Sequence, residues 1–417
     1  MKALIKSAKL LDESSPYHNK IVSIRIKNGL ITEIGANLIA KDDEKEISYE
    51  NLSVSQGWFD SSVSIGEPGY EERETIKNGL QVAAYSGFTG IAVNANSNPV
   101  IDTNSGINYL ISKSYNHAVE IFPIGALTRG SDGVDLAELY DMSQAGAVAF
   151  GDYQKSIANP NLLKLALQYA QGFDGLVISF PIENDLVGKG IANEGIVSTN
   201  LGLKGIPALA ESLQIARDLH ILEYTGGKLH IPTISSAESV ALIARAKEKG
   251  LNVTCSVSIS NLYFTDNMLF EFDTHFKMLP PLRSETDRQA LIQGVKDGVI
   301  DMVCSDHNPQ DIERKKIEFD YAAYGTIAQE ATLGALLTLV SESKAVKLLT
   351  AGRKRFAQKP EPIKEGSVAN LTLFTSKGNK VFTATDIKSK SKNAAFLGAK
   401  LKGSVYGIYS NDQFIGL

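Results

Sequence analysis

The sequence contains little cysteine or histidine and has no long apolar run. Only Cys255 and Cys304 occur in 417 residues, which excludes a disulfide framework and fits a reducing cytoplasm. The longest strongly apolar run, residues 333–340, is too short to span a bilayer. Residues 1–6 contain no apolar core of a signal peptide. With 6 histidines and 2 cysteines in all, a site for several metals would have few soft ligands to draw on.

The chain also lacks an excess of basic residues. Lys and Arg total 42 and Asp and Glu total 47, so the formal net charge is −5. This balance argues against nucleic-acid binding and against attachment to a membrane through a polybasic segment. Apolar residues make up 43% and charged residues 21%, which is ordinary for a globular protein with a large core. We therefore expect a globular cytoplasmic protein.

The middle of the chain alternates short apolar runs with helical patterns. From Leu209 to Leu219 four apolar residues repeat at spacings of 4, 3 and 3, which predicts one face of a helix. Residues 162–169 carry a similar stripe, and Asn161 is a candidate N-cap before it. Buried strands alternating with helices predict an α/β fold of the (β/α)8 barrel type, with a doubly wound sheet as the alternative. The eight candidate strands are 57–60, 89–93, 120–124, 146–150, 175–180, 228–233, 252–257 and 300–305.

Both ends of the chain are predicted to form β-structure. Residues 22–27 alternate between apolar and polar side chains, and Asn28-Gly29 predicts a hairpin turn directly after them. Residues 370–374 and 403–409 predict further short strands. We expect the two ends to form one composite β-sandwich domain, with the barrel inserted between them. The predicted ranges are 1–54 with 362–417 for the sandwich, and 55–361 for the barrel.

Polar motifs follow the predicted strands in a definite order. In a barrel, residues at the carboxyl ends of the strands carry the chemistry. The motifs are Gly57-Trp58-Phe59-Asp60, Glu67-Pro68-Gly69-Tyr70, Asn96-Ser97-Asn98-Pro99, Asn193-Glu194-Gly195, Gly205-Ile206-Pro207, Pro280-Pro281-Leu282-Arg283 and Ser305-Asp306-His307-Asn308-Pro309. Each is common by itself. As an ordered set covering nearly the whole chain, they resemble the dihydroorotases of the cyclic amidohydrolase group.

This resemblance implies a metal-dependent reaction. Dihydroorotases close carbamoyl aspartate to dihydroorotate and reopen the ring. Ring opening needs a hydroxide at neutral pH and a polarised carbonyl, and a pair of divalent metals supplies both. The implied ligands are a His-x-His after the first strand, a bridging Lys or Asp after the fourth, single histidines after the fifth and sixth, and an Asp after the eighth that also transfers the proton.

The sequence departs from that pattern at most of the implied ligand positions. Only Asp152 and Asp306 retain side chains of the implied type, and Asp306 stands at the position of the catalytic Asp. Three hydroxyl side chains and a proline replace the histidines, and none of these can replace an imidazole as a zinc ligand. The lost positions are Ser62, Ser64, Pro181 and Thr233.

The implied substrate contacts are partly lost as well. Gly66 stands where the resemblance implies an Arg for the substrate carboxylate, and Leu279 where it implies an Asn. Asn96 remains as a candidate substrate-binding residue, and Gln310 stands where a second substrate-contacting His is implied. We interpret His307 as a packed structural side chain, and find no ligand constellation among the other histidines.

Three hypotheses about function remain. The first, which we favour, is a non-catalytic dihydroorotase homologue of pyrimidine biosynthesis without a cofactor, because the ligands are lost while the scaffold motifs are kept. The resemblance implies that such homologues act as structural or regulatory subunits, with aspartate transcarbamoylase as a partner, and we expect a homo-oligomer. The second is an active dihydroorotase with an unusual metal site, zinc included, at Asp152 and Asp306. The third is a small-molecule binding protein.

Overall fold

Eight parallel strands form a barrel in the computed structural model, which describes residues 1–357 and 361–416. The strand order is β15-β14-β13-β10-β9-β8-β7-β6. A parallel bridge between Val63 and His307 joins the two ends of this sheet. Each predicted strand is present, so the (β/α)8 barrel is confirmed. The strands are β6 (Trp58–Val63), β7 (Phe88–Val93), β8 (Glu120–Gly125), β9 (Ala149–Phe150), β10 (Leu176–Ile178), β13 (Lys228–Ile231), β14 (Val253–Ser258) and β15 (Met302–Cys304).

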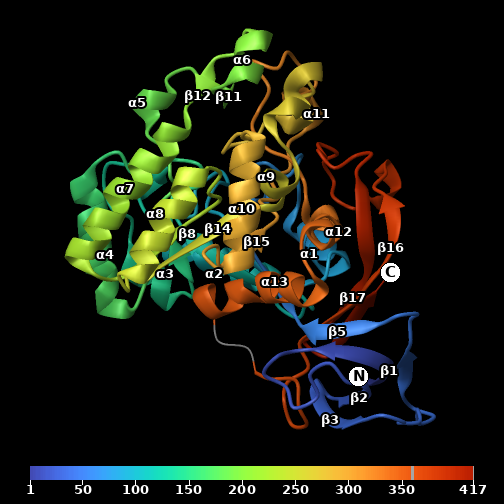
Figure 1. Ribbon diagram of the computed structural model, residues 1–417. Helices are drawn as coiled ribbons and strands as arrows, with labels where there is room; N and C mark the ends of the chain where they lie inside the picture. Colours follow the sequence, from blue (N-terminus) through green and yellow to red (C-terminus); the bar gives the residue numbers. More distant parts are fainter. Residues whose placement is uncertain (358–360, 417) are drawn as a thin grey trace.

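Helices surround the barrel (Figure 1). Several begin at a Ser or Thr whose hydroxyl accepts a backbone N–H of the first turn, as at Thr75 and Ser284. The longer helices are α1 (Ile76–Tyr85), α2 (Asn104–Lys113), α3 (Leu139–Gln144), α4 (Pro160–Ala170), α7 (Ala208–Thr225), α8 (Ala237–Glu248), α10 (Glu285–Asp297), α12 (Gln329–Leu339) and α13 (Glu342–Phe356). The short ones are α5 (Asn184–Val187), α6 (Ile196–Leu201), α9 (Ile259–Tyr263) and α11 (Ile312–Lys315). The 3-10 turns are η1 (Arg129–Ser131), η2 (Gln171–Phe173), η3 (Asp266–Glu271), η4 (Thr274–Phe276) and η5 (Ala384–Asp386).

Two predicted helices are present with corrected details. The cap of α4 is Asn159 rather than Asn161: its side chain accepts the N–H of Asn161, and Pro160 occupies the first turn. In α7, Leu209 and Leu213 of the predicted apolar stripe are exposed by 57% and 48%. Polar residues such as Glu211 are buried instead, because they hydrogen-bond to neighbouring segments.

The barrel interior is filled by a small apolar core, separate from the larger core between the strands and the helices. Phe356, at the end of α13, closes the floor of the barrel and stacks on Phe59 of β6 with ring centroids 5.9 Å apart. The other buried members of this inner core are Ala92, Ile124, Ala149, Leu176, Ile178 and Met302. A filled interior leaves only the two rims of the barrel for ligands.

The two chain ends build a second, mostly antiparallel sheet, which confirms the composite β domain. Its order is β18-β17-β16-β5-β1-β2-β3, with β4 paired to β1. Asn28 and Gly29 form the predicted turn between β2 and β3, both at positive φ. The predicted boundary at residue 54 falls inside β5. The strands are β1 (Lys2–Leu11), β2 (Ile21–Lys27), β3 (Leu30–Gly35), β4 (Lys45–Ile47), β5 (Ser53–Gln56), β16 (Leu371–Val381), β17 (Lys400–Ser410) and β18 (Gln413–Gly416).

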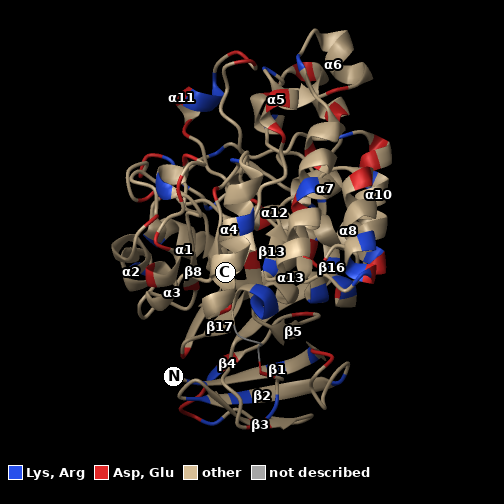
Figure 2. Cartoon of the chain, turned by 90° about the vertical axis from the view of Figure 1, so that its left-hand side faces the viewer, with Lys and Arg blue, Asp and Glu red and all other residues tan. Residues whose placement is uncertain are grey.

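The composite sheet lies below the barrel floor, and the β16–β17 hairpin rises beside the barrel, where β17 packs on α12 (Figure 1). A small parallel pair, β11 (Ala192–Asn193) and β12 (Gly205–Ile206), stands at the other end with α5 and α6. On the face in Figure 2, basic and acidic residues are interspersed. Among the described residues, no helix has the length and apolar character needed to cross a membrane.

Candidate functional site

Asp306 is the centre of the barrel mouth. It follows β15, and its φ of 47° lies in the left-handed region that an Asp rarely adopts. Its Oδ1 accepts hydrogen bonds from Ser62 Oγ at 2.9 Å and from Tyr153 Oη at 3.1 Å. Burial raises the pKa of Asp306 to about 6, although the two hydroxyl donors oppose the rise. The carboxyl is therefore held by neutral hydroxyl donors, and the charge of nearby Asp60 adds to the rise of its pKa.

Tyr153 occupies the centre of the mouth, and sequence reasoning missed it. Burial raises the pKa of its hydroxyl well above the ordinary value of 10.0, and the negative charge of Asp306 adds to this. The residue as a whole keeps intermediate exposure, so its ring separates the buried hydroxyl from solvent. Tyr153 lies in a turn three residues after β9 ends, so strand alternation does not fix its direction, and no motif in the sequence marks it.

Asp152, the predicted ligand, faces away from Asp306. Its carboxylate accepts the N–H groups of Leu127 and Thr128, at 2.9 and 3.1 Å, and the hydroxyl of Thr128. Its neighbour Phe150 likewise belongs to the outer core. These side-chain hydrogen bonds of Asp152 fix the loop after β8. Asp152 also lines the cavity beside Tyr153, and its carboxylate has other hydrogen-bond partners than that of Asp306.

Ser62 and Ser64 face the mouth from the end of β6 and the loop after it. Asn94, which follows β7, donates through Nδ2 to Ser62 Oγ at 3.2 Å and to Ser64 Oγ at 3.3 Å. Asn96 Nδ2 donates to Ser64 Oγ at 3.0 Å, while its Oδ1 is buried without a partner. Hydroxyl and amide groups therefore satisfy each other here. Asn94 was not predicted, because a single Asn after a strand carries no distinctive motif.

The remaining predicted positions contribute no ionisable group to the mouth. Thr233 is buried, with φ at 46°, and its N–H donates to Ser256 Oγ. Pro181 is buried after β10 and has no side-chain donor or acceptor. Gln310 donates to Asn308 Oδ1 at 2.9 Å and does not line the cavities beside Asp306. The left-handed backbone at Thr233 is costly for a β-branched residue.

The free space in the mouth is small. One cavity of about 20 Å³ lies between Asp152, Tyr153 and Thr233, and another of about 10 Å³ lies beside Asp306. Each has room for roughly one water molecule. A ring the size of dihydroorotate does not fit unless Tyr153 moves.

Three further buried ionisable groups lie near the mouth: Asp60, His230 and His307. Burial raises the pKa of Asp60 to about 6, although its carboxylate accepts from the N–H and hydroxyl of Ser305. Burial lowers the pKa of both His230 and His307 to about 3, so both rings are neutral at pH 7. His307 Nδ1 accepts the backbone N–H of Gln329 at 3.5 Å, in line with a packed structural role.

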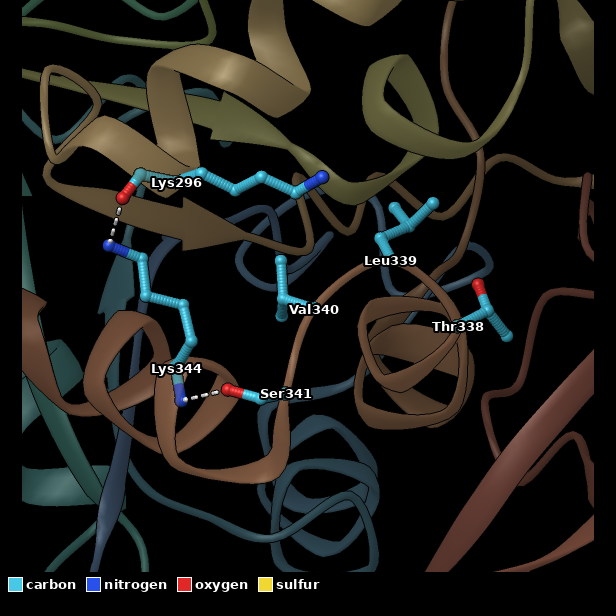
Figure 3. A pocket seen from close by; sticks show the side chains of 6 residues that line it. All are labelled: Lys296, Thr338, Leu339, Val340, Ser341 and Lys344. Carbon is cyan, nitrogen blue, oxygen red and sulfur yellow. Dashed lines mark hydrogen bonds between the residues drawn. The ribbon is translucent and has the colours of Figure 1, made fainter.

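A second, open hollow of about 360 Å³ lies at the start of α13, away from the mouth (Figure 3). Lys344 crosses it, and its Nζ donates to the carbonyl of Lys296 at 3.2 Å. No predicted site residue lies there. The residues that line it are Lys296, Thr338, Leu339, Val340, Ser341 and Lys344.

Comparison with known proteins decides the family. The family model described as Dihydro-orotase-like matches residues 53–239. The dihydroorotase of Citrifermentans bemidjiense is 37% identical over 416 residues, which cover 98% of each chain. That of Geobacter metallireducens is 37% identical over 413 residues, or 97% of each chain. The chain belongs to the dihydroorotase family. The resemblance inferred from the motifs is thereby confirmed.

Solved structures agree on the fold of this dihydroorotase-family chain. L-hydantoinase (dihydropyrimidinase) from Arthrobacter aurescens superimposes with a TM-score of 0.86 at 19% identity, covering 100% of this chain and 96% of that one. D-hydantoinase from a Bacillus sp. AR9 gives 0.82 at 20% identity, covering 99% and 95%. At such identities the likeness shows the fold alone.

The residues at the mouth do not fit the pair of metals that the family reaction uses. Zinc and its analogues bind imidazole, thiolate or carboxylate groups, whereas Ser62, Ser64, Tyr153 and Thr233 offer neutral hydroxyls. Within the described parts of the chain, no cluster of three or more His, Cys, Asp or Glu side chains could hold a metal. Asp306 alone supplies a carboxylate at the centre.

The substrate-binding arginine has no room either. A Cβ atom at Gly66 would lie 1.9 Å from the carbonyl oxygen of Tyr70, so this backbone admits no side chain at that position. The loop closes on itself there, since the N–H of Tyr70 donates to the carbonyl of Gly66 at 2.9 Å. The loss of the arginine is therefore a consequence of the loop conformation as a whole and not of one side chain alone.

Proposed function

We propose that this chain is a non-catalytic member of the dihydroorotase family, a pseudoenzyme that serves pyrimidine biosynthesis as a structural or regulatory subunit. One observation carries the proposal: Asp306 is bound by the hydroxyls of Ser62 and Tyr153, at 2.9 and 3.1 Å, where the reaction needs a metal-bound hydroxide. A serine or tyrosine hydroxyl cannot lower the pKa of water to near neutrality as a metal does. In this proposal, hydroxyl groups around one carboxyl take the place of the metal-bound hydroxide.

An active dihydroorotase with an unusual metal site is the second candidate. The names of the relatives favour it, since proteins called dihydroorotase are 37% identical over 98% of the chain. It would require Tyr153 to move out of the mouth and Asp306 to act with zinc or another divalent ion. Turnover of dihydroorotate that depends on added Zn²⁺ and is lost in Asp306→Asn would establish this candidate and reject the pseudoenzyme.

We further propose that the chain is a cytoplasmic subunit that forms homo-oligomers and binds aspartate transcarbamoylase. The support in the structure is a set of four exposed apolar side chains on α4 and α7, two helices in contact with each other. We call it the α4–α7 surface. Surfaces of this kind mark sites of association. Its members are Leu165, Tyr169, Leu209 and Leu213, exposed by 44%, 50%, 57% and 48%.

The partner proposal is tested by gel filtration of the purified chain with the aspartate transcarbamoylase of the same cell. We expect one peak that contains both proteins and elutes before either alone. Separate elution at micromolar concentrations would reject this partner. The metal and turnover assays decide the non-catalytic role independently.

A further inference from the structure

A cleft of about 950 Å³ lies between the barrel floor and the composite sheet. Glu120 and Phe122, from the first half of β8, form one wall, and Arg353, from the end of α13, forms another. The composite domain contributes Asn370, directly before β16, and Gln413 of β18. None of these residues lines the cavities at the mouth, so the cleft is a separate site at the opposite rim of the barrel.

Arg353 is a buried cation without a carboxylate partner. The residue is 9% exposed, and its guanidinium lies over the rings of Phe59 and Phe122, 5.8 and 5.6 Å from their centroids. Nη2 donates to Thr89 Oγ1 at 3.0 Å, whereas Nε has no hydrogen-bond partner within residues 1–357 and 361–416. Among the residues that the structure describes, Arg353 forms no ion pair. Burying a guanidinium in this way is costly unless an anion neutralises it.

Two carboxylate residues, Glu120 and Glu361, line the same cleft, and Glu120 is the one whose charge acts on Arg353. The Glu120 carboxylate makes no hydrogen bond or ion pair with any residue in the described part of the chain, while its backbone belongs to the β7–β8 pairing. Burial raises the pKa of its carboxyl, and the nearby Arg353 charge opposes that rise. The two groups therefore feel each other's charge but do not pair directly. A cation and an anion held apart in one cleft leave space for a molecule that carries both opposite charges.

We propose that this cleft binds a small zwitterion of the amino acid class, with its carboxylate on Arg353 and its ammonium on Glu120. Both contacts are charge-assisted hydrogen bonds, which are stronger than neutral ones. Apolar lining from Ile121, Phe122 and Val148 accommodates a side chain, and the volume is within the range of small-molecule sites. The site does not depend on whether the barrel mouth is catalytic.

Isothermal titration of the full chain with the common L-amino acids tests the proposal. Propionate and propylamine serve as half-ligands that carry only one of the two charges. We expect at least one amino acid to bind, and each half-ligand to bind at least about tenfold more weakly, the loss for one charge-assisted contact. All amino acids share the carboxylate and the ammonium that the cleft is proposed to bind. The absence of binding by every amino acid at about 10 mM would therefore overturn the proposal.

Glu120→Gln separates zwitterion binding from simple carboxylate binding. Glu120 is exposed to the cleft and supports no other residue, so the variant is expected to fold. It should weaken amino acid binding at least about tenfold, whereas propionate binding should be unchanged or stronger, because the variant removes a negative charge near Arg353. Glu248→Gln, an exposed position on α8 outside the cleft, is the matched control and should change neither. Unchanged amino acid binding by Glu120→Gln, or equal affinity for propionate and amino acids, would contradict the assignment.

Discussion

At the residue scale, the barrel mouth keeps the backbone of a reaction centre but presents different atoms. Asp306 and Thr233 retain left-handed φ angles of 47° and 46°, which turn the chain sharply at the strand ends. Such strain is typical of functional sites. The side chains placed there are nevertheless hydroxyls around a single carboxyl. We infer that this chain has lost the reaction but keeps the strained backbone at Asp306 and Thr233.

The stability of Asp306→Asn should depend on pH. Burial raises the pKa of Asp306 from 3.8 to about 6, so the folded state binds the proton more tightly than the unfolded state. This contribution stabilises the fold at low pH and is lost as the pH rises from 3.8 to about 6. We expect Asn to increase the free energy of unfolding by up to about 3 kcal/mol at neutral pH, and by less towards pH 4.

Urea unfolding of the wild type and of Asp306→Asn, at about pH 4.5 and about pH 7.5, measures this difference in the free energy of unfolding. Asp185→Asn, at an exposed position on α5, is the control. Its difference from the wild type in the free energy of unfolding should be the same at both pH values. A difference between Asp306→Asn and the wild type that is the same at both pH values would show that the Asp306 carboxyl does not titrate as described.

Tyr153→Phe should destabilise the folded protein. The change removes the hydroxyl that donates to Asp306 Oδ1 at 3.1 Å and leaves the carboxyl with one donor fewer. We expect a loss of roughly 1–3 kcal/mol in the free energy of unfolding at pH 7. Tyr140→Phe, at a residue 48% exposed, is the matched control and should cost much less. Equal losses in the two variants would show that the Tyr153 hydroxyl has no structural part in the mouth.

At the element scale, the strands were predictable and the site was predictable only in part. Strands buried on both faces are continuous apolar runs, which is why the eight barrel strands could be found from the sequence, whereas β11 and β12 were not predicted. Tyr153 could not be predicted, because it lies in the turn after β9 and only the fold brings its hydroxyl to Asp306. The buried face of α7 could not be predicted, because Glu211 and its neighbours are buried by partners distant in sequence.

Glu211→Gln should be among the most damaging single changes on α7. Glu211 is 2% exposed, accepts the N–H groups of Ser235 and Ser236 at 2.8 and 3.0 Å, and lies 3.9 Å from Arg283. The neutral amide removes the largest of the negative charges that act on Arg283, so we expect a loss of roughly 3–5 kcal/mol. Chemical denaturation measures it, beside Glu223→Gln on the exposed face of the same helix. A loss as small as that of the control would contradict this role.

At the scale of the whole molecule, the composite domain was predictable because both ends carry the alternation of strands. The cleft beneath the barrel was not, since Glu120, Arg353 and Asn370 come together only through the fold. The proposed change of function, from turnover to association, likewise depends on the whole folded molecule. A closed mouth and an exposed α4–α7 surface favour association over turnover.

Leu213→Glu tests the α4–α7 surface. A charge at this residue, 48% exposed in the isolated chain, would be buried on association, so we expect dissociation of the homo-oligomer or loss of the partner. Light scattering coupled to gel filtration gives the mass. Leu397→Glu, at a residue 42% exposed outside this surface, should leave the mass unchanged. If Leu213→Glu retains both assemblies, the interface lies elsewhere.

The most direct test is elemental analysis of the purified, untagged protein, together with dihydroorotate turnover of the same sample before and after addition of Zn²⁺ or Mn²⁺. A known active dihydroorotase assayed in parallel is the positive control. We expect only trace metal and no turnover. Asp306→Asn should match the wild type in metal content and in the absence of turnover. Metal near one equivalent or more, with turnover that Asp306→Asn abolishes, would contradict the non-catalytic role.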